Sequence, residues 1–177
     1  MNLLDETMAD FMERVSDRTS APGGGSVAAT SAALAASLAM MAARFSKEHM
    51  EDAEDLAARA DSLRSRVSSL IEKDAEVYGR VLEAKRSGGD VRAALSDAAD
   101  VPMEAAEAAA EVSDIASRLA EKGNPNLRGD ALTAGFLAEA SVRASAKLAE
   151  MNLEAAGMDD DPRIRRAQDL ERKATEK

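Results

Sequence analysis

The stretch that decides the fold is SVAATSAALAASLAMMAA, residues 26–43, which contains no charged side chain. A helix that is apolar on all sides has to be surrounded by other parts of the protein. Because alanine and serine are small, the backbones of neighbouring helices can approach such a helix closely. The run is also about as long as a membrane-spanning helix, but the rest of the chain is highly charged. We therefore predict a buried central helix in a soluble protein.

The composition favours helices over sheets. Aromatic residues make up 2% of the 177 residues and hydrophobic residues 45%, whereas sheets favour aromatic and β-branched side chains. The net charge of −10 argues against nucleic acid or an anionic membrane as the main partner. With no cysteine and one histidine, disulfides and thiol catalysis are excluded and a zinc site is not expected. The N-terminal MNLLDE lacks the features of a signal peptide, so we expect a cytoplasmic protein.

Apolar spacing predicts helices on both sides of the central run. A first helix covers about residues 5–19, and a glycine-rich break separates it from the central helix, for which Ser26 is the expected N-cap. A long helix over about residues 48–86 carries a seam whose members alternate in steps of four and three, the spacing of a helix that lies along other helices. The seam consists of Leu56, Ala60, Leu63, Val67, Leu70, Asp74, Val77 and Val81.

The C-terminal half continues as helices. One begins near Asp90, and Pro102 is expected to break or kink it. After a turn at residues 123–126, another helix runs to about Ala156, and a short charged helix ends the chain. We predict an all-α helical bundle, with residues 1–157 as the main domain and residues 158–177 as a charged helical tail. The seam helix, about 58 Å long, exceeds what a compact domain needs and predicts a homodimer.

Asp74 is the seam member that packing does not explain. Its seam neighbours are Leu70 and Val77, so its carboxyl group is expected to be partly desolvated, which raises the pKa toward the range useful for proton transfer. Tyr78 lies one turn further along the same face. The alternative is a polar seam residue that fixes the helix register or pairs with a cation across the bundle. The spacing alone leaves both interpretations open.

Two loops also carry unusual residues. The first is Pro22-Gly23-Gly24-Gly25-Ser26, whose glycines suit a backbone that something approaches closely. The following helix directs its unpaired N–H groups and its positive dipole end into that space. A tight turn between helices is an equally good interpretation. The second loop contains Asn124, Pro125 and Asn126, followed by Asp130, and Asn and Asp routinely form turns and helix caps.

Taken in order, these residues resemble the cyclodeaminase/cyclohydrolase family. That family includes the C-terminal domain of formiminotransferase-cyclodeaminase and stand-alone methenyltetrahydrofolate cyclohydrolases. The glycine loop and the Asn-Pro-Asn turn together are fairly specific, whereas each alone is weak. Besides the glycine loop and its alanine-rich helix, the similarity is carried by Glu72-Lys73-Asp74-Ala75-Glu76-Val77-Tyr78, Val101-Pro102, Gly123-Asn124-Pro125-Asn126 with Asp130, and Met151-Asn152-Leu153.

The resemblance implies an all-α fold, a homodimer and a folate site near the subunit interface. It implies that Asp74 is the catalytic carboxylate, with Tyr78 orienting that group or a water molecule. No metal and no cofactor are expected, because a tetrahydrofolate derivative is itself the substrate. The substrate-binding residues expected on this basis are Pro22, Gly23, Gly24, Gly25, Ser26, Asn124, Asn126, Asp130 and Asn152.

Asp130 and Asn152 are not expected to contact one folate molecule from the same chain. If one unbroken helix joins them, the 22 residue steps from 130 to 152 place them about 33 Å apart. We expect Asn152 to lie nearer the ligand, and Asp130 to belong with the Asn-Pro-Asn turn as a structural group.

The activity implied by the resemblance is hydrolysis of 5,10-methenyltetrahydrofolate to 10-formyltetrahydrofolate, in which water attacks the carbon between N5 and N10. The alternative is a formimidoyltetrahydrofolate cyclodeaminase, in which N10 attacks the formimino carbon and ammonia leaves. The lack of a formiminotransferase domain favours the cyclohydrolase. Relatives often carry a second Asn where this chain has Lys147-Leu148. This departure leaves open a third possibility, a non-catalytic helical module for binding or assembly.

Overall fold

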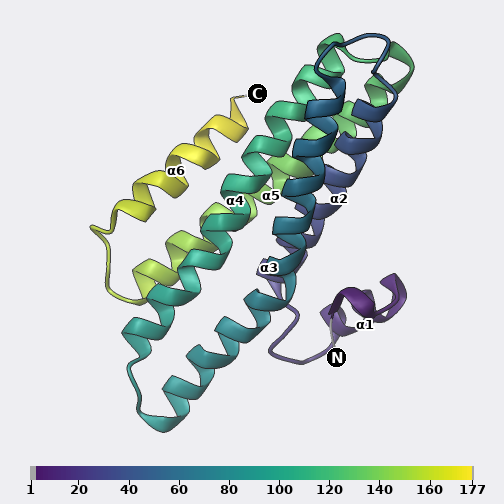
Figure 1. Ribbon diagram of the computed structural model, residues 1–177. Coiled ribbons are helices and arrows are strands. Elements are labelled where there is room, and N and C mark those ends of the chain that lie inside the picture. Colours follow the sequence, from purple (N-terminus) through teal and green to yellow (C-terminus); the bar gives the residue numbers. More distant parts are fainter. Residues whose placement is uncertain (1–2, 177) are drawn as a thin grey trace.

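The protein is an all-α bundle, as the sequence predicts. The computed structural model describes residues 3–176, which form six α-helices, two short 3-10 helices and no strand. Helices α3, α4 and α5 are long and lie beside α2, whereas α6 packs along α4 and α5, and α1 stands apart (Figure 1). The helices are η1 (Leu3–Asp5), α1 (Met8–Ser16), α2 (Gly24–Arg44), α3 (Ala53–Ser87), α4 (Val91–Lys122), η2 (Pro125–Leu127), α5 (Arg128–Ala155) and α6 (Pro162–Thr175).

Helix α2 is the centre of the bundle because its side chains are small enough for three helices to reach it. It packs against α3, α4 and α5. By length and composition α2 is apolar enough to cross a membrane, and half of its most apolar stretch is buried inside the bundle. The inward alanines with no exposed surface are Ala32, Ala35, Ala36, Ala39 and Ala43.

The predicted seam of α3 is confirmed. Its seven apolar members are all buried, and they pack against α2 and α4. Asp74, the eighth member, is half-buried between Leu70 and Val77. The heptad spacing is therefore a reliable guide here, because a long straight helix presents one stripe to its neighbours over its whole length.

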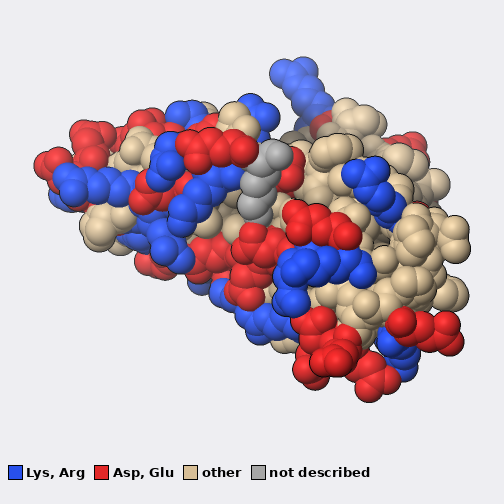
Figure 2. Space-filling view, turned by 90° about the horizontal axis from the view of Figure 1, so that it is seen from above, with Lys and Arg blue, Asp and Glu red and all other residues tan. Residues whose placement is uncertain are grey.

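The prediction that other parts of the protein surround the central helix on all sides is wrong for the single chain. One stripe of α2 faces away from α3, α4 and α5, and its apolar side chains are exposed: Val27 by 36%, Leu34 by 48% and Phe45 by 63%. Charged residues crowd the side of the molecule that carries α6 and thin out toward the opposite side, where other residues form most of the surface (Figure 2). The lone chain thus leaves an apolar strip uncovered.

Two local predictions are corrected by the structure. The N-cap of α2 is Gly23 rather than Ser26, because the helix begins three residues earlier than predicted and Ser26 turns its hydroxyl toward α3. Pro102 does not break α4, which continues as one helix from Val91 to Lys122. Proline removes one backbone donor from a helix, and a side chain on another helix compensates for that loss, as described below.

Candidate active site

Asp74 projects from α3 onto the first turn of α2. A Cβ atom on Gly25 would overlap the Asp74 carboxylate, so only glycine at position 25 leaves room for it. In the same turn, the Ser26 Oγ lies 3.1 Å from Asp74 Oδ2, and the Ser26 backbone N–H also donates to the carboxylate. The N-terminus of α2 therefore surrounds Asp74 with donors and with the positive end of a helix dipole, which favour the charged form.

Burial opposes these donors and outweighs them. Desolvation raises the pKa of Asp74 above its ordinary value, and the hydrogen bonds from the Ser26 hydroxyl and backbone N–H offset only part of the rise. No charged neighbour contributes to the shift. This favours the proton-transfer interpretation over that of a cation-paired seam residue, because a raised pKa brings a carboxyl group closer to the range in which it exchanges protons.

Asp74 lies at the wall of a cavity of about 340 Å³ between the α1–α2 segment, α3, α4 and α5. The cavity contains one carboxylate and no lysine or arginine, so its charge suits a cationic ligand. Within residues 3–176, no group of three or more His, Asp or Glu side chains is arranged to hold a metal ion. The lining residues are Thr19, Ser20, Ala21, Gly23, Gly24, Gly25, Asp74, Ala75, Tyr78, Pro102, Leu148 and Asn152.

Six of the predicted catalytic and substrate-binding residues meet at this cavity: Gly23, Gly24, Gly25, Asp74, Tyr78 and Asn152. Pro22 and Ser26 are buried beside it and do not line it. Sequence reasoning missed Thr19 and Ser20 as lining residues, because nothing in their local pattern distinguishes them from other loop residues.

Pro102 and Asn152 form a structural pair in the wall of the cavity. A helix residue normally donates its N–H to the carbonyl four residues earlier, and Pro102 has no N–H to give to Ala98. The side-chain Nδ2 of Asn152 donates to the Ala98 carbonyl instead, at 3.1 Å. This bond explains why α4 passes through Pro102 unbroken, and it fixes the Asn152 amide at the edge of the site.

The remaining predicted residues lie at the opposite end of α2. Asn124 donates from Nδ2 to the Phe45 carbonyl and accepts from the Asn126 N–H, and its own N–H donates to Ser46 Oγ at 2.9 Å. Asp130 follows in the first turn of α5. Twenty residue steps along α2 amount to about 30 Å, so within one chain Asn124, Asn126 and Asp130 do not reach Asp74.

Helix α5 joins Asp130 to Asn152 without a break. The predicted separation of about 33 Å required one unbroken helix between the two residues, and α5 is such a helix. Asn152 lines the cavity, and Asp130 lies near the Asn-Pro-Asn turn. Whether either side chain binds a folate stays a prediction.

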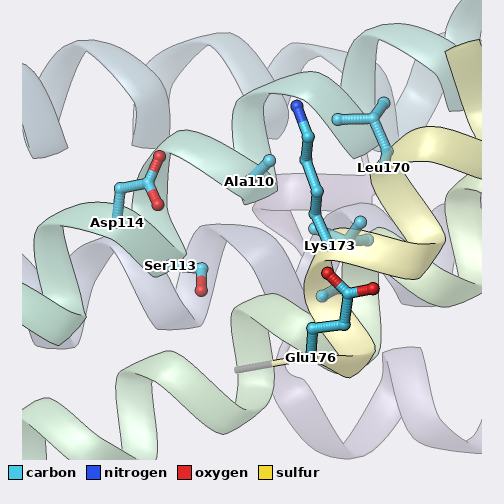
Figure 3. Close-up of a pocket in the computed structure, with 8 residues that line it drawn as sticks. Ala110, Ser113, Asp114, Leu170, Lys173 and Glu176 are labelled. Atoms are coloured by element: carbon cyan, nitrogen blue, oxygen red, sulfur yellow. The ribbon is translucent and has the colours of Figure 1, made fainter.

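A second cavity, of about 250 Å³, lies between α4, α5 and α6. Figure 3 shows Ser113 and Asp114 on α4, with Lys173 and Glu176 near the C-terminus. Its lining includes a lysine beside two carboxylates and contains none of the predicted site residues. We therefore assign the chemistry to the Asp74 cavity.

The fold and this cavity define an all-helical bundle protein whose site is built around a desolvated carboxylate at a helix N-terminus. The chain belongs to the formiminotransferase-cyclodeaminase family, which it matches over residues 7–172. This confirms the resemblance drawn from the sequence.

Named relatives come from bacteria and mammals. The chain is 30% identical to methenyltetrahydrofolate cyclohydrolase of Methylorubrum extorquens, over 88% of this chain and 82% of that protein. It is 29% identical to formimidoyltransferase-cyclodeaminase of Mus musculus, but it spans only 29% of that protein's length. Among solved structures, formiminotetrahydrofolate cyclodeaminase of Thermotoga maritima superposes with a TM-score of 0.86 at 26% identity, covering 98% of this chain and 90% of that one.

Proposed function

We propose that the protein is a cytoplasmic folate one-carbon enzyme that hydrolyses 5,10-methenyltetrahydrofolate to 10-formyltetrahydrofolate. The observation that carries the proposal is Asp74, a carboxylate with a raised pKa in a cavity without any basic side chain. The substrate is a cation at the carbon that reacts, so an unpaired carboxylate both attracts it and can take up a proton beside it. The bacterial relative that aligns over most of its own length carries the same activity in its name.

In the proposed reaction, Asp74 acts as the general base. A water molecule attacks the carbon between N5 and N10, and one of its protons passes to the Asp74 carboxylate as the new C–O bond forms. The C–N5 bond then breaks, N5 takes a proton from Asp74, and loss of the remaining hydroxyl proton to solvent leaves the formyl group on N10. Tyr78, one turn along α3 and at the same cavity, orients the water or the carboxylate.

The second candidate is the cyclodeaminase reaction, which the similarity to the Thermotoga maritima structure favours. N10 attacks the formimino carbon on N5, and ammonia leaves after it gains a proton. This reaction also needs one group that moves protons beside a cationic carbon, and Asp74 fills that role in both reactions. The two activities therefore differ in the substrate accepted rather than in the residue that transfers protons.

A spectrophotometric assay tests the proposal. Methenyltetrahydrofolate absorbs in the near ultraviolet and its hydrolysis product does not, so loss of the band reports hydrolysis, and its appearance from the formimino substrate reports cyclodeamination. We expect loss of the methenyl band with wild-type protein and a loss at the background rate with Asp74→Asn. Activity with neither substrate would identify the chain as a non-catalytic helical module.

We further propose that the enzyme works as a homodimer joined through the exposed stripe of α2. Val27, Leu34 and Phe45 form an apolar line along one helix, and a symmetric dimer places the same patch of both copies in contact. An antiparallel pairing of the two α2 helices brings the end that carries Asn124 and Asn126 of one chain toward the Asp74 end of the other. Residues that are about 30 Å apart in one chain then serve one site.

Two measurements test this arrangement. Light scattering at micromolar concentration should report a dimer, and Leu34→Glu should convert it to a monomer. An equal mixture of two inactive variants, Asp74→Asn and Asn126→Ala/Asp130→Ala, should recover about a quarter of the wild-type activity, because half of the dimers are mixed and each has one intact site. A dimer without recovery would place each site within a single chain, and a monomer would refute the proposal.

A further inference from the structure

The Ser26 hydroxyl faces two acceptors but has one proton to donate. Its Oγ lies 3.0 Å from the Ile71 carbonyl oxygen and 3.1 Å from Asp74 Oδ2. Ser26 is completely buried, so water cannot supply a second partner. A hydroxyl group donates to one acceptor at a time. The direction of this hydroxyl is therefore a choice between the peptide carbonyl and the carboxyl group.

The charge on Asp74 decides that choice. A charged carboxylate accepts a hydrogen bond about twice as strong as a neutral acceptor does, so it attracts the hydroxyl proton away from the Ile71 carbonyl. Once Asp74 is protonated, the peptide carbonyl is the better acceptor of two neutral groups. If the new proton resides on Oδ2, the carboxyl O–H can also donate a hydrogen bond to Ser26 Oγ, because a hydroxyl oxygen accepts while its own proton points elsewhere.

We propose that Ser26 is a positioning residue whose hydroxyl switches between Asp74, when the carboxylate is charged, and the Ile71 carbonyl, when Asp74 is protonated. The proposal rests on the assignment of Asp74 as the proton-transfer group. With this switch, the base can gain and lose a proton inside the bundle without leaving the hydroxyl unpaired, which would be costly. Ser26 thus supports the reaction from behind the carboxylate without touching the substrate.

The surroundings make Asp74 the group that drives the switch. The α1–α2 segment contributes Thr19 and Ser20 to the cavity, α4 contributes Pro102, and α5 contributes Leu148 and Asn152, none of which titrates. Tyr78, on α3, is the other ionisable side chain in the lining. Asp74 is the carboxyl group that contacts the Ser26 hydroxyl, so its protonation is the change of charge that the hydroxyl meets directly.

Carbon-13 NMR can observe both acceptors without any substrate. The chain has three isoleucines, Ile71, Ile115 and Ile164, so protein labelled at the isoleucine carbonyl carbon gives three signals, which Ile→Val variants assign. We expect the Ile71 signal to move with pH at the same midpoint as the Asp74 Cγ signal of aspartate-labelled protein. The Ile115 and Ile164 signals should not follow that midpoint.

Ser26→Ala should abolish the Ile71 titration and raise the pKa of Asp74 by about half a unit to one unit, because the charged state loses the stronger of the two bonds. Ser141→Ala is the matched control. Ser141 is also a buried serine, and its hydroxyl donates to the Ala28 carbonyl of α2 at 2.8 Å. This control should leave the Ile71 titration and the Asp74 midpoint unchanged.

Two outcomes would overturn the proposal: an Ile71 signal that is constant across the Asp74 midpoint, or one that still titrates in Ser26→Ala. In the assay, the acid limb of the kcat/KM profile of Ser26→Ala should move to higher pH by the same half to one unit. If neither folate substrate reacts, the proposed function fails. The NMR titration still decides the switch in that case, so the two failures are distinguishable.

Discussion

The two ends of helix α2 use similar residues for different purposes. At the N-terminal end, Gly25 leaves room for Asp74, and a serine hydroxyl contacts the carboxylate. At the C-terminal end, Gly123 leaves room for Ser46, because an added Cβ would lie 2.8 Å from the Ser46 Oγ, and that oxygen accepts the Asn124 N–H.

The two ends differ in whether their polar side chains have hydrogen-bonding partners within the fold. Ser46 and the Asn124 side chain spend their polar groups on backbone partners. Asp74 instead keeps a desolvated charge at the wall of a cavity. Ser46 and the Asn124 side chain therefore serve the fold, whereas the Asp74 carboxylate keeps hydrogen-bonding capacity for a ligand.

The largest effect should come from Asp74→Asn. We expect kcat to fall by about 100-fold or more, which is the usual contribution of a positioned general base. The fold should be retained and the unfolding temperature should not fall, because the variant removes a partly buried charge. Steady-state kinetics and circular dichroism measure both. Retention of more than about a tenth of the rate, a change of under about 1.4 kcal/mol in the barrier, would remove Asp74 as the base and erase the contrast between the two ends.

Gly25→Ala should damage the N-terminal end in both stability and activity. The new methyl group has to displace the Asp74 carboxylate; overpacking of this kind typically lowers the unfolding free energy by about 1–3 kcal/mol, and misplacing a reacting group by about 1 Å lowers turnover by up to about 100-fold. Urea denaturation and the folate assay give the two values.

Gly79→Ala is the control for that substitution, because Gly79 lies in α3 with no atom within 4 Å of an added Cβ. It should raise stability by up to about 1 kcal/mol through helix propensity. Equal effects at positions 25 and 79 would show that the Asp74 carboxylate can move aside at little cost. Glycine at position 25 would then not be needed to accommodate that carboxylate.

Ser46→Ala should affect the C-terminal end in stability alone. The variant leaves the Asn124 N–H without its acceptor, so we expect the unfolding free energy to fall by about 1–3 kcal/mol, while kcat at a temperature well below unfolding changes by less than about threefold. Ser37→Ala, which removes only a hydrogen bond within α2, should stay within about 0.5 kcal/mol of wild type. A large loss of kcat in Ser46→Ala would show that the bond from the Asn124 N–H to Ser46 Oγ positions the Asn-Pro-Asn turn for the partner's site rather than serving the fold alone.

The smallest effect is a pH dependence of stability that belongs to the N-terminal end. The pKa of Asp74 is raised in the folded protein above its ordinary value of 3.8, so between that pH and the raised value the folded state binds more protons than the unfolded one. Stability contributed by this group is present below pH 3.8 and falls as pH rises through the window. Urea titrations should therefore show Asp74→Asn gaining stability relative to wild type from about pH 4 upward, and a constant difference would contradict the raised pKa.

Much of the fold could be predicted because it depends on long repeated patterns. The seam of α3 and the uncharged run of α2 specify burial over many residues, and a single misjudged position changes little. Helix ends and the Pro102 position depend on single hydrogen bonds. Whether Pro102 breaks α4 is decided by Asn152, fifty positions later, which no local pattern reveals.

The site was predictable where a residue contradicts its surroundings. Asp74 interrupts an apolar seam, and the three glycines interrupt a helical sequence, so both features can be recognised from the sequence alone. The sequence shows that Asn124, Asn126 and Asp130 are unusual but not which end of α2 they occupy, because the distance between the ends follows from how α4 and α5 return along the bundle.

The bond between Asn152 and the Ala98 carbonyl also constrains the order in which this protein can accept substitutions. Replacing Asn152 first leaves a buried helix carbonyl without a donor, so the substitution is penalised while Pro102 is present. Replacing Pro102 first supplies a backbone N–H to that carbonyl and releases the amide. The two positions are therefore epistatic, and a lineage can exchange the polar group at position 152 at low cost only after it has lost the proline on a different helix.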